Sequence, residues 1–402
     1  MAAEEENDVV ELEESITKEK TTKKKKTSTS KPQDDLLVFL AGIKGISEVM
    51  KKRLHKVLGS QGISDPRGIK THTLKQLMEL PGVSENTAKL LLEEVESIQG
   101  KLFLSLDERE QIEVKRKKIM TGSLELDELI GGGIPTGTFV ELYGSPQSGK
   151  TQICYTISAN CLLPREFGGL EAGVIWLDTE GSFNTQRLKQ IISYYEYTHN
   201  IKNVKTDRFM VANTRTLAQI ELALKEAGSI IPKNKVKLMI IDSLMDPFRA
   251  EYGGLGELAV RQKHLNKLLH MLMRLAEAYD IAVVYTNQVM ANPDPFATAM
   301  DKVMPTGGFI LGHASDIRIW LRRATSKIRN QHDAPNARRA LITDCGWLPQ
   351  NECHFSLGPF GVCDVDQEAN HRKLAGELGV LFESSLGKEE KEDVKTEFAT
   401  LD

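Results

Sequence analysis

Apolar and polar positions between residues 119 and 367 alternate in blocks that predict strands separated by helices. Continuous apolar runs of the kind found in buried parallel strands occur at Thr138–Tyr143, Val174–Leu177, Phe209–Ala212, Leu238–Ile241 and Ile281–Tyr285. Helical patterns of apolar residues occupy 149–163, 185–195, 215–230 and 257–279 between these runs. Because strands that alternate with helices form a mostly parallel, twisted sheet covered by those helices, the pattern predicts an α/β core.

A different pattern, an internal repeat, occupies residues 35–97. The segment Ile43–Glu48 recurs as Leu80–Glu85, 37 residues later, and each copy has a glycine, an apolar residue, a serine and a glutamate in series. Gly45 and Gly82 permit tight turns, and the serines can cap the helices that follow, so the repeat predicts two helix-turn-helix units in a small all-α domain. Such a unit could bind the DNA backbone through its exposed amides and nearby lysines, or it could be a helical packing module that binds protein or nothing.

Charge is distributed in blocks along the chain. Residues 1–34 lack apolar periodicity and predict a disordered charged tail, in which the lysine-rich stretch 18–31 is either solvated, a DNA contact or a nuclear address. Residues 98–118 are expected to form a linker, and residues 368–402 a charged C-terminal tail. The net charge of -4 and the pI near 6.2 predict no overall attraction to nucleic acid, so DNA binding would need local basic surface.

The composition also excludes several classes of protein. No apolar run approaches the roughly 18 residues of a membrane span, and the acidic N-terminus does not resemble a secretory signal, so an intracellular protein is expected. Five cysteines without a CxxC pair argue against a disulfide framework and a zinc site. Cys154 and Cys161 are seven residues apart in a helical pattern, which predicts that both lie on one face in the core.

The clearest chemical motif is Gly144–Thr151, which fits GxxxxGK[ST] and lies between a predicted strand and a predicted helix. Backbone amides of such a loop cradle phosphates, the Lys150 ammonium is expected to reach the β- and γ-phosphates of ATP, and the Thr151 hydroxyl to bind Mg²⁺. Asp242 ends the apolar run Leu238–Ile241, so it fits the carboxylate that helps to hold the metal.

A general base is expected at the same sheet edge, at the end of the strand Val174–Leu177. Glu180 and Asp178 are both candidates. Glu180 is favoured as the base, because Asp178 is nearer the strand body and could merely cap the next turn.

Motif order and spacing now allow a comparison with a known family. Residues 101–365 resemble the ATPase core of the archaeal RadA and eukaryotic strand-exchange recombinases of the RecA/RadA family, and the repeat resembles the paired helix-hairpin-helix units that precede that core. The resemblance rests on the P-loop and on these segments: Thr121–Ser123, Leu126–Asp127, Gly131–Ile134, Val174–Glu180, Asp242–Leu244, Phe248–Tyr252, Leu258–Ala259, Arg261–Gln262, Thr286–Val289, Gly307–Gly308 and His313–Ser315. It implies a RecA-like P-loop ATPase core behind a helix-hairpin-helix domain.

The resemblance also implies roles for individual residues. Glu180 would activate water with Lys150 and Gln288 as further catalytic residues, where Gln288 senses the γ-phosphate and links the state of ATP to a DNA loop. Arg187 would flank the adenine, and Asp344 would cap the ATP of a neighbouring subunit. The complete nucleotide set is Gly144, Ser145, Pro146, Gln147, Ser148, Gly149, Lys150, Thr151, Gln152, Arg187 and Asp344, with Thr151 and Asp242 as the Mg²⁺ ligands.

Two DNA loops are implied at about 249–257 and 289–306, and the second is rich in residues that break regular structure. The DNA-binding set is Arg249, Leu255, Arg261, Asn292, Phe296, Gly307 and Gly308, together with Gly45 and Gly82 of the repeats. Other basic residues in or near this region could bind phosphate or be ordinary surface charge: Lys302, Arg318, Arg322 and Arg323.

The chain departs from the family pattern at several positions. Leu255 stands where the first DNA loop usually has an arginine between two glycines. The subunit-linking motif Phe-x-x-Ala reads Phe103-Leu104-Ser105-Leu106, so Phe103 can still enter a pocket on a neighbour while Leu106 is bulkier than alanine. Further departures are Asn184 for an arginine, Val260 for an acidic residue, the P-loop interior Ser145-Pro146, and a segment at 324–339 that exceeds the family's hairpin.

The favoured hypothesis is an ATP- and Mg²⁺-dependent recombinase that forms filaments on single-stranded DNA, pairs it with double-stranded DNA and exchanges strands. It would act with copies of itself and with recombination mediators, in the cytoplasm of an archaeon or the nucleus of a eukaryote. The alternative is a recombinase paralogue that binds ATP as a mediator without strand exchange. A RecA-fold regulatory ATPase unrelated to DNA fits poorly with the tandem repeats.

Overall fold

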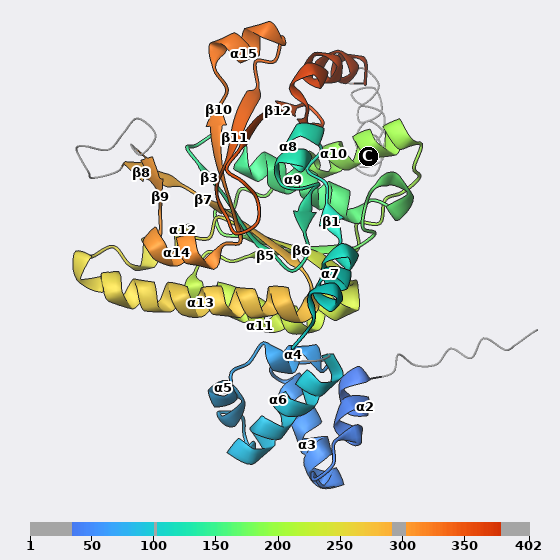
Figure 1. Cartoon of the computed structure of the whole chain (residues 1–402), viewed down its shortest axis with the longest axis vertical. Coiled ribbons are helices and arrows are strands. Elements are labelled where there is room, and N and C mark those ends of the chain that lie inside the picture. The colour runs from blue at the N-terminus through green and yellow to red at the C-terminus, as the bar shows by residue number, and fades with distance from the viewer. Residues whose placement is uncertain (1–33, 100–102, 292–302, 379–402) are drawn as a thin grey trace, which may run out of the picture.

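The computed structural model describes residues 34–99, 103–291 and 303–378, which form a helical unit below an α/β core (Figure 1). The candidate residues Asn292, Phe296 and Lys302 lie outside the described residues. Among the described residues, no helix is both long enough and apolar enough to cross a membrane.

A nine-stranded sheet forms the centre of the core, with the strand order β13-β12-β11-β10-β3-β7-β6-β4-β5. The strands from β10 to β5 in this order are parallel, whereas β11, β12 and β13 add an antiparallel edge. Their bounds are β3 Phe139–Gly144, β4 Gly173–Asp178, β5 Phe209–Asn213, β6 Val236–Asp242, β7 Ala282–Asn287, β10 Ile317–Arg323, β11 Ala337–Cys345, β12 Glu352–Gly358 and β13 Gly361–Cys363. The predicted α/β fold with a mostly parallel sheet is confirmed.

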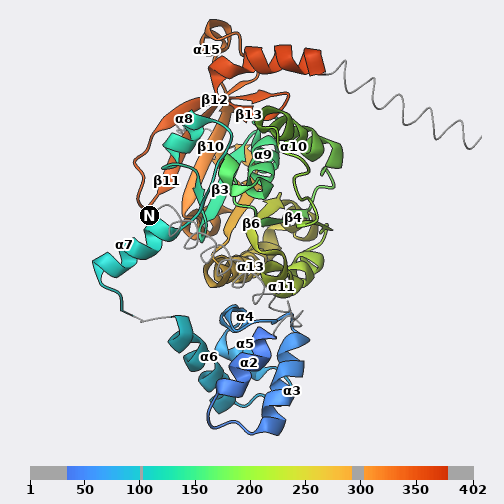
Figure 2. The same cartoon turned by 90° about the vertical axis from the view of Figure 1, so that its right-hand side faces the viewer.

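Helices cover both faces of this sheet (Figures 1 and 2). Because successive strand residues point to opposite faces, Val140 and Leu142 of β3 join one apolar cluster, and Phe139 joins the other. The first face carries α8 (Leu124–Leu129), α9 (Lys150–Leu162) and α10 (Thr185–His199), and the second carries α11 (Leu217–Asn234), α12 (Asp246–Glu251), α13 (Leu258–Tyr279) and α14 (Gly308–Ala314).

The predicted strands and helices of the core are present, and the differences lie at their ends. The helix expected at 185–195 continues to His199, where Asn200 adopts the left-handed conformation that ends it. The helix expected at 215–230 continues to Asn234 and includes Pro232 in its last turns. Cys154 and Cys161 are both fully buried in α9, as expected.

Shorter elements complete the core. Two-stranded sheets pair β1 (Lys118–Ile119) with β2 (Ile134–Pro135) and β8 (Val289–Ala291) with β9 (Val303–Pro305). The segment at 324–339 contains α15 (Ser326–Gln331) between β10 and β11. Three short 3₁₀ helices lie at Arg165–Phe167, Leu255–Glu257 and Val365–Gln367, and a helix follows at residues 368–378.

The two copies of the repeat each form two helices around a tight turn. The first copy has α2 (Asp35–Gly42) and α3 (Glu48–Gly59), the second has α5 (Leu74–Met78) and α6 (Glu85–Gln99), and α4 (Arg67–Lys70) lies between the two copies. Gly45 and Gly82 have positive φ angles of 86° and 78°, and Ser47 and Ser84 accept hydrogen bonds from the backbone amides of Met50 and Thr87. The predicted turn glycines and serine caps are therefore present in both copies.

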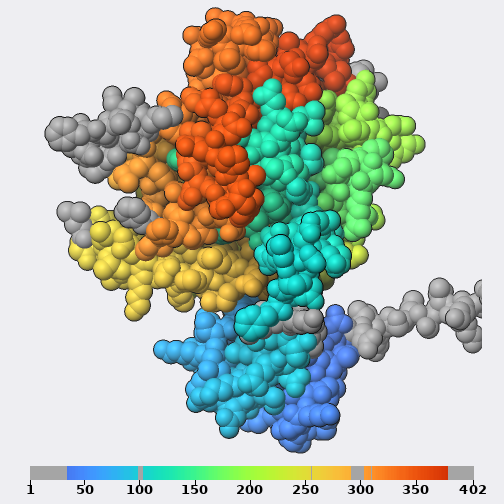
Figure 3. Space-filling model, in the orientation of Figure 1, coloured from blue at the N-terminus to red at the C-terminus, as the bar shows by residue number. Residues whose placement is uncertain are grey.

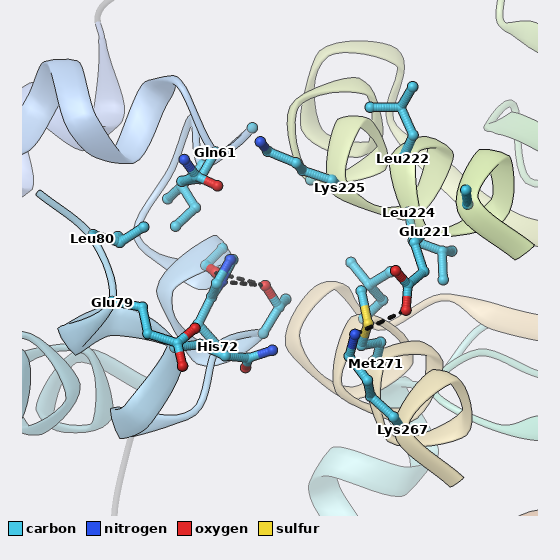
Figure 4. Close-up of a pocket in the computed structure, with 18 of the residues that line it drawn as sticks. Gln61, His72, Glu79, Leu80, Glu221, Leu222, Leu224, Lys225, Lys267 and Met271 are labelled. Atoms are coloured by element: carbon cyan, nitrogen blue, oxygen red, sulfur yellow. Dashed lines mark hydrogen bonds and ion pairs between the residues drawn. The ribbon is translucent and has the colours of Figure 1, made fainter. Parts of the chain in front are cut away.

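The helical unit packs against α11 and α13 of the core. The space-filling view shows it in contact with the lower side of the core (Figure 3). Arg274 donates from Nε to the carbonyl oxygen of Thr71 at 2.8 Å, and the Arg67 guanidinium lies 5.1 Å from the centre of the Tyr279 ring. Beside this contact is a cavity of about 590 Å³ between the two parts, lined by polar and apolar side chains that include His72 and Lys225 (Figure 4).

The linking helix α7 (Leu106–Lys115) lies between the helical unit and the core in the sequence and stands out at the side of the core in Figure 2. Ser105 caps it, because its hydroxyl accepts from the Glu108 amide while the Glu108 carboxylate accepts from the Ser105 amide. None of the ten residues of α7 is buried, so the helix is held by its own capping and leaves its apolar side chains exposed.

Candidate functional site

The P-loop lies where β3 ends and α9 begins, as the motif predicts. Lys150 is the first residue of α9, and its ammonium donates to the carbonyl oxygens of Gly144 at 2.9 Å and Ser145 at 3.1 Å. The side chain therefore curls over the loop that the motif assigns to the phosphates. Burial lowers the pKa of Lys150, while the nearby Asp242 and Glu180 carboxylates act in the opposite direction.

Asp242 ends β6 beside the P-loop and is 3% exposed. One carboxylate oxygen accepts a hydrogen bond from the Thr151 hydroxyl at 2.8 Å, and the other accepts from the Thr286 hydroxyl. Burial raises the pKa of Asp242, although these two hydrogen bonds and the Lys150 charge oppose that effect. The expected Mg²⁺ ligands thus lie together.

This pair of oxygen donors fits the chemistry of Mg²⁺, which takes one or two carboxylate or hydroxyl ligands from a protein and the rest from phosphate and water. No cluster of three or more His, Cys, Asp or Glu side chains suited to a metal occurs in the parts of the chain that the structure describes. A hydroxyl with one carboxylate is therefore the donor set that a nucleotide-bound metal would meet here.

Glu180 and Asp178 occupy different environments after β4. The Asp178 carboxylate accepts from the backbone amides of Gly181, Ser182 and Phe183 at 2.8–3.2 Å, so it caps the turn. Glu180 is exposed beside the P-loop, and its Oε1 accepts from the Ser243 hydroxyl at 2.8 Å. The local geometry favours Glu180 as the group that is free to meet a substrate.

A chain of hydrogen bonds leads from Glu180 to Arg249, at the start of the segment expected to form the first DNA loop. Gln288 Nε2 lies 3.5 Å from Glu180 Oε1, and Gln288 Oε1 accepts from Arg249 Nη1 at 2.8 Å. Arg249 belongs to α12 and also pairs with Asp246 at 3.0 Å. The side chains assigned to catalysis and to DNA are thus in direct contact.

Arg187 lies on α10, where its Nε donates to Gln152 Oε1 at 2.9 Å and its Nη1 donates to the carbonyl oxygen of Pro359. Asn184, which replaces the family's arginine, caps α10 by accepting from the Arg187 amide at 2.9 Å. The departure at position 184 therefore has a local structural role.

Asp344 is exposed on β11, far from the P-loop of its own chain along the sheet. In the strand register, Asp344 of β11 lies opposite Arg318 of β10, and Arg318 lies opposite Glu141 of β3. The P-loop begins beside Leu321, at the other end of β10. Asp344 is consequently not part of the nucleotide site within one chain, and only a second subunit could bring it to a nucleotide.

The described DNA candidates of the core gather at one side. Arg249 and Arg261 flank the turn that contains Leu255, and Gly307 and Gly308 begin α14 after β9. The start of α13 and the strands β8 and β9 emerge on the same side of the molecule (Figure 1). The two loop bases therefore face a shared surface.

Arg318 does not belong to that surface. Its side chain is 15% exposed, and its Nε donates to the buried Glu141 carboxylate at 2.6 Å. The possibility that Arg318 binds DNA phosphate is therefore not supported, because the guanidinium is engaged inside the core.

The two repeat turns are not equivalent. Nothing lies within 4 Å of the position that a Cβ would occupy on Gly45, whereas at Gly82 it would meet the Arg53 guanidinium at 2.4 Å. The first turn is thus open, and the second is covered by a side chain from α3.

Phe103 and Leu106 of the expected subunit-linking motif are 87% and 82% exposed. Such exposure of two large apolar side chains three residues apart is typical of a contact surface. Neither side chain packs into the chain's own core.

Two side chains at the P-loop were not identified from the sequence. The Thr286 hydroxyl donates to the Asp242 carboxylate, to which the Thr151 hydroxyl also donates. Arg338 of β11 donates from Nε to the carbonyl oxygen of Gln147 at 3.2 Å. Thr286 comes just before Asn287 at the end of an apolar run, which is a usable signal. The sequence gives no such signal for Arg338, because it lies 191 residues from its partner Gln147.

Comparisons with known proteins bear on this site. A sequence model of the family described as Rad51 matches residues 113–365. The DNA repair and recombination protein RadA of Metallosphaera sedula is 38% identical over 331 residues, which cover 81% of this chain and 96% of that protein. The RadA protein of Aeropyrum pernix is 35% identical over 328 residues, which cover 73% of this chain and 98% of that protein. The similarity extends over nearly the whole length of both relatives.

Proposed function

The chain belongs to the Rad51 family, and from this membership and the site geometry we propose that it is an ATP-dependent recombinase of DNA repair and homologous recombination. It binds single-stranded and double-stranded DNA, assembles into filaments and exchanges strands. The observation that carries the proposal is the contact series Glu180–Gln288–Arg249, because it joins the nucleotide site to a DNA loop through two side-chain contacts.

The roles in hydrolysis follow from position. The P-loop amides and Lys150 hold the phosphates, and Glu180 accepts the proton of the attacking water. Thr151 and Asp242 would hold Mg²⁺, which when bound would neutralise phosphate charge. Gln288 lies beside Glu180, so it is placed to respond to the γ-phosphate.

Coupling to DNA follows from the second contact of Gln288. Arg249 donates from Nη1 to Gln288 and from Nη2 to Asp246, so a DNA phosphate that drew the guanidinium toward itself would break the hydrogen bond to Gln288. When DNA takes Arg249, the amide oxygen of Gln288 loses a donor, and Gln288 is free to reorient toward the nucleotide. DNA binding would in this way stimulate hydrolysis.

Assembly completes the site. Phe103 enters an apolar pocket of the next subunit, and Asp344 of one subunit caps the nucleotide of another. The exposure of Phe103 and the distance of Asp344 from its own P-loop support this arrangement. Recombination mediators would act on the same surfaces.

Lys150→Ala tests the enzymatic part. We expect loss of ATPase activity and of strand exchange, measured with ATP, Mg²⁺ and single-stranded DNA alongside imaging of filaments. Lys189→Ala, which removes an exposed lysine from α10, is the matched control and should retain both activities. Retention of ATPase activity by Lys150→Ala would remove the site assignment.

The second candidate function is that of a mediator paralogue, and Leu255 and Leu106 favour it because each replaces a residue usual in the family. ATP-dependent DNA binding by the wild-type chain without exchanged product would support this function. Leu255→Arg would then be the next variant, since it restores a cation to the first DNA loop.

A further inference from the structure

A buried ion pair lies beneath the nucleotide site and takes no part in the chemistry described above. Glu141 belongs to β3, three residues before the P-loop, and is 0% exposed. Its Oε2 pairs with Arg318 Nε at 2.6 Å. Burial by itself lowers the pKa of Arg318, but the Glu141 carboxylate raises it above its ordinary value, so the guanidinium remains charged.

The second oxygen of Glu141 holds an amide on the neighbouring strand. Glu141 Oε1 accepts from Asn287 Nδ2 at 2.7 Å, and Asn287 is the fully buried last residue of β7. The same Nδ2 donates to the carbonyl oxygen of Thr306 at 2.7 Å. Both amide protons of Asn287 are therefore used on acceptors.

The amide oxygen of Asn287 in turn faces two donors. It accepts from the backbone amide of Gln288 at 2.8 Å and from the Thr306 hydroxyl. A flipped amide would set its NH₂ group against these donors and its oxygen against the two acceptors. The Glu141 carboxylate thus acts together with Thr306 and the Gln288 amide to set which way the Asn287 amide points, and it is the one charged acceptor among them.

Gln288 and Thr306 are the two ends of the second DNA loop. The Thr306 amide donates to the Gln288 carbonyl oxygen at 3.0 Å, and β8 and β9 pair immediately beyond them. Asn287 therefore clamps both ends of the loop at one point. Through Glu141 this point is tied to the strand that carries the P-loop.

A purely structural role explains the pair less well. Backbone hydrogen bonds already join β3 to both β10 and β7, in registers that place Glu141 opposite Arg318 and Tyr285. Buried ion pairs can often be replaced by apolar residues without loss of stability, so strand pairing does not require this one. What apolar residues cannot replace is an acceptor that orients Asn287.

We propose that Glu141, with Arg318 as its counter-ion, is a positioning residue that orients Asn287 and thereby holds Gln288 and Thr306 at the base of the second DNA loop. The expected consequence is that Gln288 responds to DNA only when its backbone is held by Asn287. This consequence rests on the proposed function.

Two double variants separate positioning from packing. Glu141→Leu with Arg318→Met removes both charges and the acceptor for Asn287. Glu141→Gln with Arg318→Gln removes both charges but keeps an oxygen that can face Asn287. Since neither variant leaves an unpaired buried charge, both should fold, which circular dichroism and thermal unfolding would check.

The direct measurement is hydrogen exchange at the backbone amides of Gln288 and Thr306, in the full chain without DNA. We expect at least 10-fold faster exchange in the Leu/Met variant and near-normal exchange in the Gln/Gln variant. Equal protection of these amides in the wild type and the Leu/Met variant would overturn the proposal, as would equally fast exchange in both variants.

The second measurement is ATPase activity with and without single-stranded DNA. We expect the Leu/Met variant to keep its basal rate within about twofold and to lose most of the stimulation by DNA, and the Gln/Gln variant to keep both. Full stimulation in the Leu/Met variant would overturn the coupling. A wild-type chain without any stimulation would contradict the proposed function instead, and hydrogen exchange would still decide the role of Glu141.

Discussion

Burial shifts the pKa of Asp127, a carboxylate that lies away from the expected nucleotide site. It is 4% exposed in α8, and burial raises its pKa to about 6, although the backbone amide of Thr121 opposes this by donating to its Oδ1 at 2.8 Å. The folded-state pKa lies above the unfolded value, so the native state binds more protons between about pH 4 and pH 6. Stability must therefore fall as pH rises through that window.

Asp127→Asn should remove this part of the pH dependence. The amide oxygen can still accept from Thr121, but position 127 no longer titrates. We expect the stability of the variant relative to the wild type to rise from pH 4 to pH 7 by roughly 2–3 kcal/mol. Urea unfolding at several pH values measures it, with the exposed Asp107→Asn as the control for loss of one charge. A constant difference across this range would contradict the prediction.

A second prediction at the residue scale tests whether Glu180 or Asp178 is the general base. If Glu180 is the base, Glu180→Gln should lower the ATPase rate roughly 10²- to 10⁴-fold while nucleotide binding persists. The reason is that the amide keeps the hydrogen bond from Ser243 but cannot take a proton. Single-turnover hydrolysis together with binding of a fluorescent nucleotide measures both quantities. A Glu180→Gln variant with normal turnover would return the assignment to Asp178.

Among the elements, α7 is notable because its sequence makes a capped helix without a buried face. Its capping box and the ion pair between Arg109 and Glu113 at 2.8 Å are local interactions. Its exposed apolar residues include Ile112 and Val114 besides Leu106. Such a helix stabilises itself locally, and a partner is needed to bury its apolar side chains.

Phe103→Ala should weaken subunit association. Full burial of a phenylalanine contributes about 1.5–3 kcal/mol, so association should weaken roughly 10- to 100-fold. Light scattering across a range of protein concentrations measures this effect. Val49→Ala is the control, because it removes an apolar side chain of 81% exposure from α3. An unchanged association constant for Phe103→Ala would exclude Phe103 from the subunit contact.

At the scale of the whole molecule, the helical unit docks on the core through close backbone contact. A Cβ on Gly228 of α11 would lie 2.8 Å from the carbonyl oxygen of Gly62, and a Cβ on Gly62 would lie 2.2 Å from the carbonyl oxygen of Lys225. Side chains at either position would push the two parts apart. The docked arrangement thus depends on glycine at both positions.

Gly228→Ala should therefore separate the helical unit from the core, even though alanine favours the helix itself. Small-angle X-ray scattering in a Phe103→Ala background, which limits assembly, should show a larger radius of gyration. Gly376→Ala is the matched control, because it also lies in a helix and nothing is within 4 Å of its added Cβ. Identical scattering curves for Gly228→Ala and its parent would show that docking tolerates the methyl group.

Much of the fold and part of the site could be predicted from contiguous residues. The run Leu238–Ile241 with Asp242, the P-loop before α9 and the strand before Glu180 each combine an element and its chemistry in one segment. Strands β10, β12 and β13 were missed, because β13 has only three residues and polar residues interrupt the apolar positions of β10 and β12. Asn292 and Phe296 stay predictions.

The sequence by itself determined the α/β class, the repeat of turns and caps, and the position of the P-loop motif between a strand and a helix, because each depends on periodicity or spacing within a few residues. Only the tertiary structure decided three hydrogen bonds: from Thr286 to Asp242, from Arg338 to the P-loop, and from Asn287 to Glu141. These partners are far apart in the chain, and no local pattern predicts the contacts between them. They meet because the strand order places β11, β10, β3, β7 and β6 side by side, and a buried polar group needs a partner wherever the sheet provides one.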